Sequence, residues 1–424
     1  MDTSKSFSAR HGILYGLLGL PLAFVALPLY VILPNHYARA FGVPLATLGA
    51  VLLGARLLDA VIDPLIGRWC DRLFSRSAQA VLVFGAFAGI VLAAGFGLLF
   101  FPATRSPTPL LVWASVFLVV TYAAYSALSV AHQSWGAMLG GDETQRSRIV
   151  AWREGLGLVG VVLASVTPLA IGLAPTVALF WIALVAGWVA WTRAPQPRAS
   201  PVAHPGDIWL PFRRPAFRRL LGVFVLNGIA SAIPATLVLF FVQDRLQAPK
   251  AMESAFLAIY FLAAALSIPL WLRAVAYCGL ARSWMFGMAL AVAAFIWATR
   301  LGSGDVVAFA VVCALSGIAL GTDLALPGAM LAGVISRSGD SGRFEGAYFG
   351  WWNFATKLNL ALAAGLALPL LALFGYTPGA RGDVALDALT AAYCLLPCAL
   401  KLAALAALYT LIIRPGKIRQ TPCH

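Results

Sequence analysis

Two aspartates and an arginine interrupt an otherwise apolar stretch of the chain. In LGARLLDAVIDPLIGRWCDR, residues 53–72, Asp63 follows Asp59 by four positions and Arg56 precedes Asp59 by three. In a helix, side chains at these spacings project from one face. Two close carboxylates resist double ionisation, so one of them can hold a proton near neutral pH unless a basic residue such as Arg56 screens it. The spacing therefore predicts a polar site on one face of this helix.

The composition places this site in a membrane. Of the 424 residues, 61% are hydrophobic and only 11% are charged, which is more apolar than a soluble domain of this length needs to fill its core. Ionisable groups at membrane depth are costly unless they are paired or hydrated, so they usually face a bundle interior or a watery cavity. The sequence therefore predicts a polytopic membrane protein with a polar site inside it.

Several function classes are excluded. The net charge of +14 comes from short basic clusters beside apolar runs, which is a loop pattern of membrane proteins and not a folded nucleic-acid-binding face. The sequence has no Gly-rich phosphate loop, metal-ligand cluster or nucleophile elbow. Cys394 and Cys398 lack a nearby His or Cys partner and are interpreted as small core residues. We expect no enzyme, no ATP-driven machine, no nucleic-acid partner, no metal and no cofactor besides a coupling ion, H⁺ or Na⁺.

Twelve apolar runs are each about long enough to cross a bilayer. A segment rich in Pro and Arg, residues 194–218, separates six runs from six. The predicted fold is an all-α membrane protein with twelve transmembrane helices in two six-helix halves, 1–193 and 219–424, joined by a cytoplasmic linker. The approximate runs are 12–33, 44–67, 78–101, 109–138, 149–172, 175–193, 219–242, 251–275, 283–300, 305–334, 344–374 and 386–413.

The distribution of basic residues predicts the orientation. Most of the 30 Lys and Arg residues lie in the amino terminus, the loops after even-numbered runs, the central linker and the carboxyl terminus. Because cytoplasmic loops of membrane proteins carry an excess of Lys and Arg, both termini are expected in the cytoplasm. We expect a monomer in the lipid bilayer of a bacterial cytoplasmic (inner) membrane.

The two halves carry a trace of internal duplication. GAML ends the fourth run at 136–139 and recurs at the end of the tenth run at 328–331. Four residues are a short repeat, but they occupy equivalent positions in the two halves and therefore support an internal duplication. The eighth run, which corresponds to the run with Asp59 and Asp63, has no acid in SIPLWLR at 267–273. The carboxylates therefore belong to one half only, as a specialised site would.

Four segments carry a resemblance to a known family. GRWCDRLFSR after the second run resembles the Gly-x-x-x-Asp-Arg loop of the major facilitator superfamily. ARLLDAVIDPLIG, TDLALPGAML and YFGWWNFATKLNLALAAG resemble the glycoside-pentoside-hexuronide:cation symporters, the melibiose permease group. The resemblance covers the whole chain and implies the major facilitator fold. It implies a coupling cation bound by Asp59 and Asp63, with Lys357 near them.

The chain departs from the melibiose permease pattern at three places. The Lys-Asp pair that serves the sugar in the first helix is replaced by Leu20 and Pro21, and the sugar-binding acid of the fourth helix is lost from a segment with His132 and Gln133. The Asn between the two cation-site acids is Ile62 here. A galactoside site of the melibiose type is therefore not expected. Sodium prefers several oxygen ligands, whereas a proton needs one titratable carboxylate, so a proton is the expected ion.

Other polar and aromatic residues in the runs could have either a functional role in transport or a purely structural role. Arg56 and Lys357 are charge partners of the acids or structural residues, and Gly67, Asp71 and Arg72 form a cytoplasmic gate that latches helix ends. A histidine or tryptophan can pack instead of touching a solute, Arg153 and Glu154 can form a gate salt bridge, and Lys401 can simply neutralise Asp323. The candidate substrate-cavity residues are His132, Gln133, Trp135, Arg153, Glu154, Asp323, Trp352 and Asn353.

The predicted function is secondary active transport by alternating access, with the site near the bilayer midplane between the two halves. We expect symport of a small solute, a sugar or glycoside, with a proton favoured over sodium. A transporter of lysophospholipids or other amphiphiles is an alternative, since a lysophospholipid carrier resembles the same family. A non-transporting receptor or scaffold is a second alternative. It has no need for three buried acids opposed by three buried bases, and it usually carries a larger soluble domain.

Overall fold

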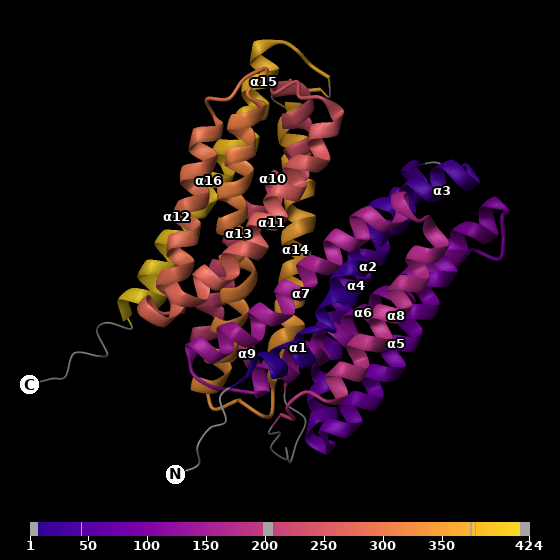
Figure 1. Cartoon of the computed structure of the whole chain (residues 1–424), viewed down its shortest axis with the longest axis vertical. Coiled ribbons are helices and arrows are strands. Elements are labelled where there is room, and N and C mark those ends of the chain that lie inside the picture. Colours follow the sequence, from indigo (N-terminus) through magenta and orange to yellow (C-terminus); the bar gives the residue numbers. More distant parts are fainter. Residues whose placement is uncertain (1–6, 44, 198–206, 374, 378, 416–424) are drawn as a thin grey trace, which may run out of the picture. The chain divides into compact units, whose positions relative to one another are not determined.

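The computed structural model describes residues 7–43, 45–197, 207–373, 375–377 and 379–415. Helices joined by loops make up this described part of the chain (Figure 1). In a bilayer core no water can satisfy backbone N–H and C=O groups, so apolar runs of this length form helices, in which each backbone bond closes within the segment.

Among the described residues, ten helical segments are both long and apolar enough to cross a membrane. Two more long helices carry intramembrane charges: α4 has 32 residues and α14 has 29. Together these elements cover the twelve predicted runs, so the all-α membrane fold is confirmed. The protein is a multi-pass integral membrane protein.

The chain divides into two packing units. The first contains residues 1–213 and 332–354, and the second contains residues 214–331 and 355–424, so α13 and α14 contribute to both. The first unit contains α1 (Ala9–Gly16), α2 (Gly19–Leu27), η1 (Pro28–Ile32), α3 (Leu33–Phe41), α4 (Leu45–Arg76), α5 (Ala78–Phe100), α6 (Pro107–Met138), α7 (Glu143–Ala170), α8 (Leu173–Thr192) and α9 (Leu210–Arg213).

The second unit is built on the later helices. They are α10 (Pro215–Phe240), η2 (Phe241–Arg245), α11 (Lys250–Cys278), α12 (Leu280–Ala298), α13 (Val306–Arg337), α14 (Glu345–Leu373), α15 (Asp383–Thr390), η3 (Ala391–Leu395), α16 (Leu396–Leu408) and η4 (Tyr409–Ile413). Its core is an aromatic and aliphatic cluster in which Phe241 and Tyr393 stack at 4.3 Å between ring centroids.

The first predicted run is not one regular helix. It breaks between α1 and α2, where the Leu20 N–H donates to the Leu17 carbonyl at 3.2 Å. Pro21 has no N–H, so it cannot make the helical bond to the Leu17 carbonyl, and the chain takes the tighter turn instead. A π-helical turn, η1, follows at Pro28. The predicted run is a candidate membrane span over Ala9–Leu27, as expected, with local irregularities in its hydrogen-bond ladder at two prolines.

The predicted linker, 194–218, is partly helical. Residues 198–206 lie outside the described residues, but α9 occupies its later part and α10 begins at Pro215, four positions before the predicted start at 219. Proline suits the first turn of a helix because its missing N–H has no helical partner there. Trp351 packs on Trp209 at 4.9 Å and donates a hydrogen bond to the Ile208 carbonyl at 2.8 Å. This aromatic contact anchors the segment before α10.

Candidate functional site

The two acids of α4 are buried as the sequence predicts. Asp59 is 4% exposed and Asp63 is 0% exposed, whereas Arg56 is exposed. The Ser126 hydroxyl on α6 donates to Asp59 Oδ1 at 2.8 Å. A hydroxyl can donate to a carboxylate and can also accept from a protonated carboxyl group. Ser126 can therefore satisfy Asp59 in either protonation state, which suits a site that gains and loses a proton.

Sequence reasoning missed Ser126. It lies in the fourth apolar run, where a serine is unremarkable because its hydroxyl can bond its own helix. The structure gives it a partner 67 positions away. No local pattern reports such a pairing, although the paired acids called for a polar group from another helix.

The Gly67 and Asp71 motif joins α4 to the start of α14. Asp71 Oδ1 accepts from the Gly346 N–H at 2.6 Å, and Oδ2 accepts from the Ala347 N–H at 2.8 Å. A carboxylate at a helix start satisfies amides that have no partner within the helix and favours the positive end of its dipole. Asp71 therefore caps α14, and its role in a cytoplasmic gate stays a prediction.

Gly67 lets these two helices approach closely. A Cβ atom at Gly67 would overlap the Gly346 carbonyl, and a Cβ at Gly350 would meet the Asp63 carbonyl at 2.7 Å. Small residues at helix crossings allow such backbone contact. Arg72 is exposed and its carbonyl accepts from the Ser75 hydroxyl. Glycine spacing thus places the backbone at Asp63 directly against α14.

The substrate-cavity candidates on α6 make hydrogen bonds to other protein groups. His132 is 0% exposed, its Nε2 lies 2.7 Å from the Tyr15 carbonyl, and the Tyr15 hydroxyl donates to the His132 carbonyl at 3.0 Å. Trp135 Nε1 donates to the Pro195 carbonyl at 2.9 Å. Gln133 donates to the Ser129 hydroxyl at 3.0 Å. These contacts favour the packing interpretation for all three residues.

Arg153 and Glu154 form an ion pair between sequence neighbours on α7. The guanidinium approaches Glu154 Oε1 to 2.5 Å, with the side chains 13% and 27% exposed. The Arg153 backbone also packs against Gly19 of α2, where a Cβ would not fit. The pair matches the salt-bridge interpretation of these two residues.

Asp323 lies at the centre of a buried polar network in the second unit. Its Oδ1 accepts from Trp284 Nε1 at 2.8 Å and from Asn227 Nδ2 at 3.0 Å. Its Oδ2 accepts from Lys401 at 3.0 Å and from the Ser231 hydroxyl at 3.1 Å. Lys401 also donates to Asn227 Oδ1 at 2.8 Å. The network ties together α10, α12, α13 and α16.

The expected pairing of Asp323 with Lys401 is present, but three members of the network were missed. Asn227, Ser231 and Trp284 are single polar groups in apolar runs and have no mutual spacing that a sequence shows. The sequence feature that could have led to them is Asp323 itself, because an acid buried in a membrane needs several hydrogen-bond donors, and these must come from other helices.

The remaining candidates lie on α14. Trp352 is buried and Asn353 is half-buried, both in the first unit, and Lys357 is half-buried in the second. Within the described ranges, no group of three or more His, Cys, Asp or Glu side chains is arranged to hold a metal ion.

The helical architecture and the buried intramembrane charges define a membrane protein of the major facilitator fold. A family model described as MFS/sugar transport protein matches residues 14–414. The chain belongs to this family, which is a transporter family and not an enzyme family.

Three curated relatives are symporters by name. The chain is 29% identical over 136 residues to "Inner membrane symporter YicJ" and 29% identical over 149 residues to "Putative glycoside/cation symporter YagG", both of Escherichia coli (strain K12). These matches cover 31% and 34% of this chain but span only 28% and 32% of the relatives. "Uncharacterized symporter YjmB" of Bacillus subtilis (strain 168) is 22% identical, covering 90% of this chain and 86% of that protein.

Solved transporter structures share the fold. A bacterial homologue of the iron transporter ferroportin in the outward-facing state superposes with a TM-score of 0.73 at 15% identity, covering 95% of this chain and 98% of that one. The major facilitator transporter FucP in the outward conformation gives 0.68 at 14% identity, covering 95% and 99%. At these identities the likeness concerns the fold alone.

Proposed function

We propose that this protein is a cation-coupled symporter that moves a small solute of the sugar or glycoside class by alternating access. The observation that carries the proposal is the buried pair Asp59 and Asp63 on α4, with the Ser126 hydroxyl on Asp59. Buried acids inside a membrane protein mark ion or proton pathways because burial is too costly to be kept without use. Both Escherichia coli relatives are named symporters, and the name of YagG specifies a glycoside and a cation.

The proposed coupling ion is a proton. Ile62 lies between the two acids, so that position offers no side-chain oxygen to a sodium ion, which prefers several hard ligands. The Ser126 hydroxyl can remain hydrogen-bonded whether or not Asp59 is protonated. Proton uptake would neutralise the pair and permit the two halves, 1–193 and 219–424, to exchange access between the two sides of the membrane.

A receptor or scaffold role has less support. Asp59 and Asp63 are buried in the first unit, and Asp323 and Lys401 are largely buried in the second. A structural protein has no use for so many desolvated charges, because replacing a buried ion pair by apolar residues is often neutral or stabilising. A largely apolar cavity in the second unit supports the alternative of an amphiphilic solute.

The test is solute uptake into proteoliposomes. Vesicles containing the purified protein receive either a proton gradient or a sodium gradient at fixed pH, with sugars and aryl glycosides as solutes. We expect accumulation that follows the proton gradient and changes little with sodium. A steep dependence on sodium would contradict the choice of ion, and the absence of any accumulation or counterflow would contradict transport itself.

A further inference from the structure

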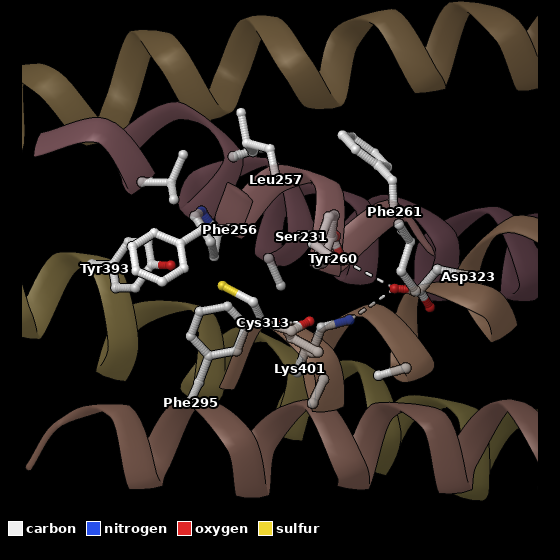
Figure 2. A pocket seen from close by; sticks show the side chains of 18 residues that line it. Ser231, Phe256, Leu257, Tyr260, Phe261, Phe295, Cys313, Asp323, Tyr393 and Lys401 are labelled. Atoms are coloured by element: carbon white, nitrogen blue, oxygen red, sulfur yellow. Dashed lines mark hydrogen bonds and ion pairs between the residues drawn. The ribbon is translucent and has the colours of Figure 1, made fainter. Parts of the chain in front are cut away.

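The second unit encloses a cavity of about 290 Å³. Five aromatic side chains contribute to its wall, and Figure 2 shows Phe295 and Tyr393 at the opposite side from Asp323. The aromatic residues are Phe256, Tyr260, Phe261, Phe295 and Tyr393. The volume lies at the lower end of the ~300–1,000 Å³ typical of small-molecule sites, which are largely apolar with a few placed polar groups.

The charges beside this cavity favour an uncharged ligand. Lys401 and Asp323 form an ion pair at 3.0 Å and compensate each other. A carboxylate has about four acceptor positions, and four protein donors already occupy those of Asp323. A charged ligand would lose its hydration without finding an unpaired opposite charge, and this penalty is large in an apolar site.

Three hydrogen-bonding groups on the wall remain available. Lys401 has three N–H donors, and its bonds to described residues use two of them. The hydroxyls of Tyr260 and Tyr393 make no hydrogen bond to any described residue, although both side chains line the cavity. A buried tyrosine hydroxyl usually has a partner. These groups fit a ligand that carries a hydroxyl or another uncharged polar group.

We propose that this cavity binds an uncharged amphiphile, a flat apolar ring system with a hydroxyl-type polar group. Aromatic walls suit such a ring, whereas a free hexose would leave hydroxyls unpaired against Phe side chains. Aryl glycosides carry a ring of this kind as their aglycone, so the proposal narrows the solute class. To that extent it rests on the proposed function, but binding needs no gradient and can be measured separately.

The test uses the full chain in lipid nanodiscs with 2-naphthol as the probe. Calorimetry compares it with 2-naphthoate, an anion, and 2-naphthylmethylammonium, a cation, at neutral pH. We expect one saturable 2-naphthol site per chain and binding at least tenfold weaker for each charged analogue. An equal or tighter Kd for either charged analogue would overturn the proposal.

A matched pair of variants locates the site. Ala235 is exposed and lines the cavity, whereas Ala258 is exposed on α11 and does not line it. Ala235→Phe fills the space and should weaken 2-naphthol binding at least tenfold, while Ala258→Phe should leave it unchanged. If Ala235→Phe does not fold, Leu257→Trp provides a second filling variant. Unchanged binding in a folded filling variant would overturn the assignment.

The binding experiment and the transport experiment test the two proposals independently. Binding of 2-naphthol by a protein that shows no gradient-driven uptake would contradict the proposed symport and leave the cavity site intact. Uptake of a free sugar by a protein that does not bind 2-naphthol would contradict the cavity site and leave symport intact.

A separate observation concerns a groove of about 680 Å³ in the first unit, between α4, α5 and α6. Its wall is largely apolar and partly exposed, with Leu65 57% and Phe87 66% exposed. Trp69 packs edge-to-face on Phe84 at 5.2 Å. Arg68 and Arg72, near the end of α4, also line it. The groove thus combines an apolar wall with two positively charged arginine side chains.

No acid within the described part of the chain pairs with either of these arginines. Neither Arg68 nor Arg72 forms an ion pair with any described residue, and Arg68 Nε is buried without a hydrogen-bond partner there. Arginine presents a planar fork of donors that matches phosphate oxygens. We infer that the groove binds one anionic phospholipid, with its phosphate on Arg68 and Arg72 and an acyl chain along the apolar wall.

Native mass spectrometry of the full chain tests this inference with lipids that share the same acyl chains. We expect a bound phosphatidylglycerol that phosphatidylcholine and inorganic phosphate do not replace. Arg68→Gln with Arg72→Gln should reduce its occupancy at least fivefold, whereas Arg76→Gln, an exposed position in the last turn of α4 outside the groove, should not. Equal occupancy in both variants would overturn the lipid site, and competition by free phosphate would assign it to a soluble anion.

Discussion

At the scale of single residues, the two halves hold their buried acids in different ways. Four donors surround Asp323 and fill the acceptor positions of its carboxylate. Asp59 instead accepts from Ser126, a hydroxyl that can reverse its role. The donors differ in kind, because the Lys401 ammonium and the Trp284 indole N–H on Asp323 cannot accept a hydrogen bond, whereas the hydroxyl on Asp59 can.

Asp59→Asn and Asp63→Asn should each abolish gradient-driven accumulation, because an amide cannot take up the coupling cation in exchange for charge. Folding should be largely retained, since asparagine keeps the size and one acceptor oxygen. Uptake assays on reconstituted variants give the measurement, with thermal melting as the check on folding. Asp383→Asn, at an exposed position, is the matched control and should accumulate normally. Normal accumulation in both α4 variants would remove these acids from the mechanism.

At the scale of elements, helix contacts depend on residues that the apolar pattern does not distinguish. The twelve runs could be predicted because length and hydrophobicity are enough to define a membrane helix. The Pro21 break could not be placed, because proline is tolerated in membrane helices when other groups satisfy the backbone. The donors to Asp323 come from separate helices, so only the packed structure brings them together.

Gly67→Ala should disturb the contact between α4 and α14. Its methyl group would overlap the Gly346 carbonyl, and overpacking of this kind costs about 1–3 kcal/mol. We expect a lower melting temperature and slower transport. Gly54→Ala on the same helix meets nothing within 4 Å and should be neutral or slightly stabilising, because alanine is the better helix former. Equal behaviour of the two variants would show that close approach at Gly67 is not required.

Lys401→Met should destabilise the second unit strongly. It leaves Asp323 charged and removes its counterion, and breaking a buried pair in this way costs about 3–5 kcal/mol. Thermal melting should show a large decrease for Lys401→Met and almost none for Arg300→Met, which removes an exposed charge. A small decrease for Lys401→Met would mean that water or another group already compensates Asp323.

At the scale of the whole molecule, the sequence predicts the fold better than the site. Composition and run length were sufficient for the all-α membrane class, and the family match over 14–414 agrees with it. The acids of α4 were visible because charge is rare in apolar runs. His132 and Trp135 were ambiguous, because the same residue types can line a cavity or pack, and only their contacts with Tyr15 and Pro195 separate these roles.

Both termini should lie on the cytoplasmic side, because the Lys and Arg bias of the loops opposes their translocation. Protease sites added at the amino and carboxyl ends provide the measurement. Both should be cleaved in inside-out vesicles and protected in right-side-out vesicles. Cleavage of one end in each preparation would mean an odd number of crossings and would contradict the twelve-helix topology.

The Asp71 cap also has a mechanical meaning. Asp63 and Asp71 are eight residues apart on one continuous helix, a rise of about 12 Å at 1.5 Å per residue. Pro64 lies inside this helix beside Asp63, and the Asp71 cap ties the helix after it to the first peptide groups of α14. Because those groups are backbone amides, the cap does not use the side chain of Ala347, whereas any Cβ at position 346 would overlap the Gly67 carbonyl and lie 2.7 Å from Asp71 Oδ1. The joint between α4 and α14 therefore depends on the absence of a side chain at position 346 as well as on the Asp71 carboxylate.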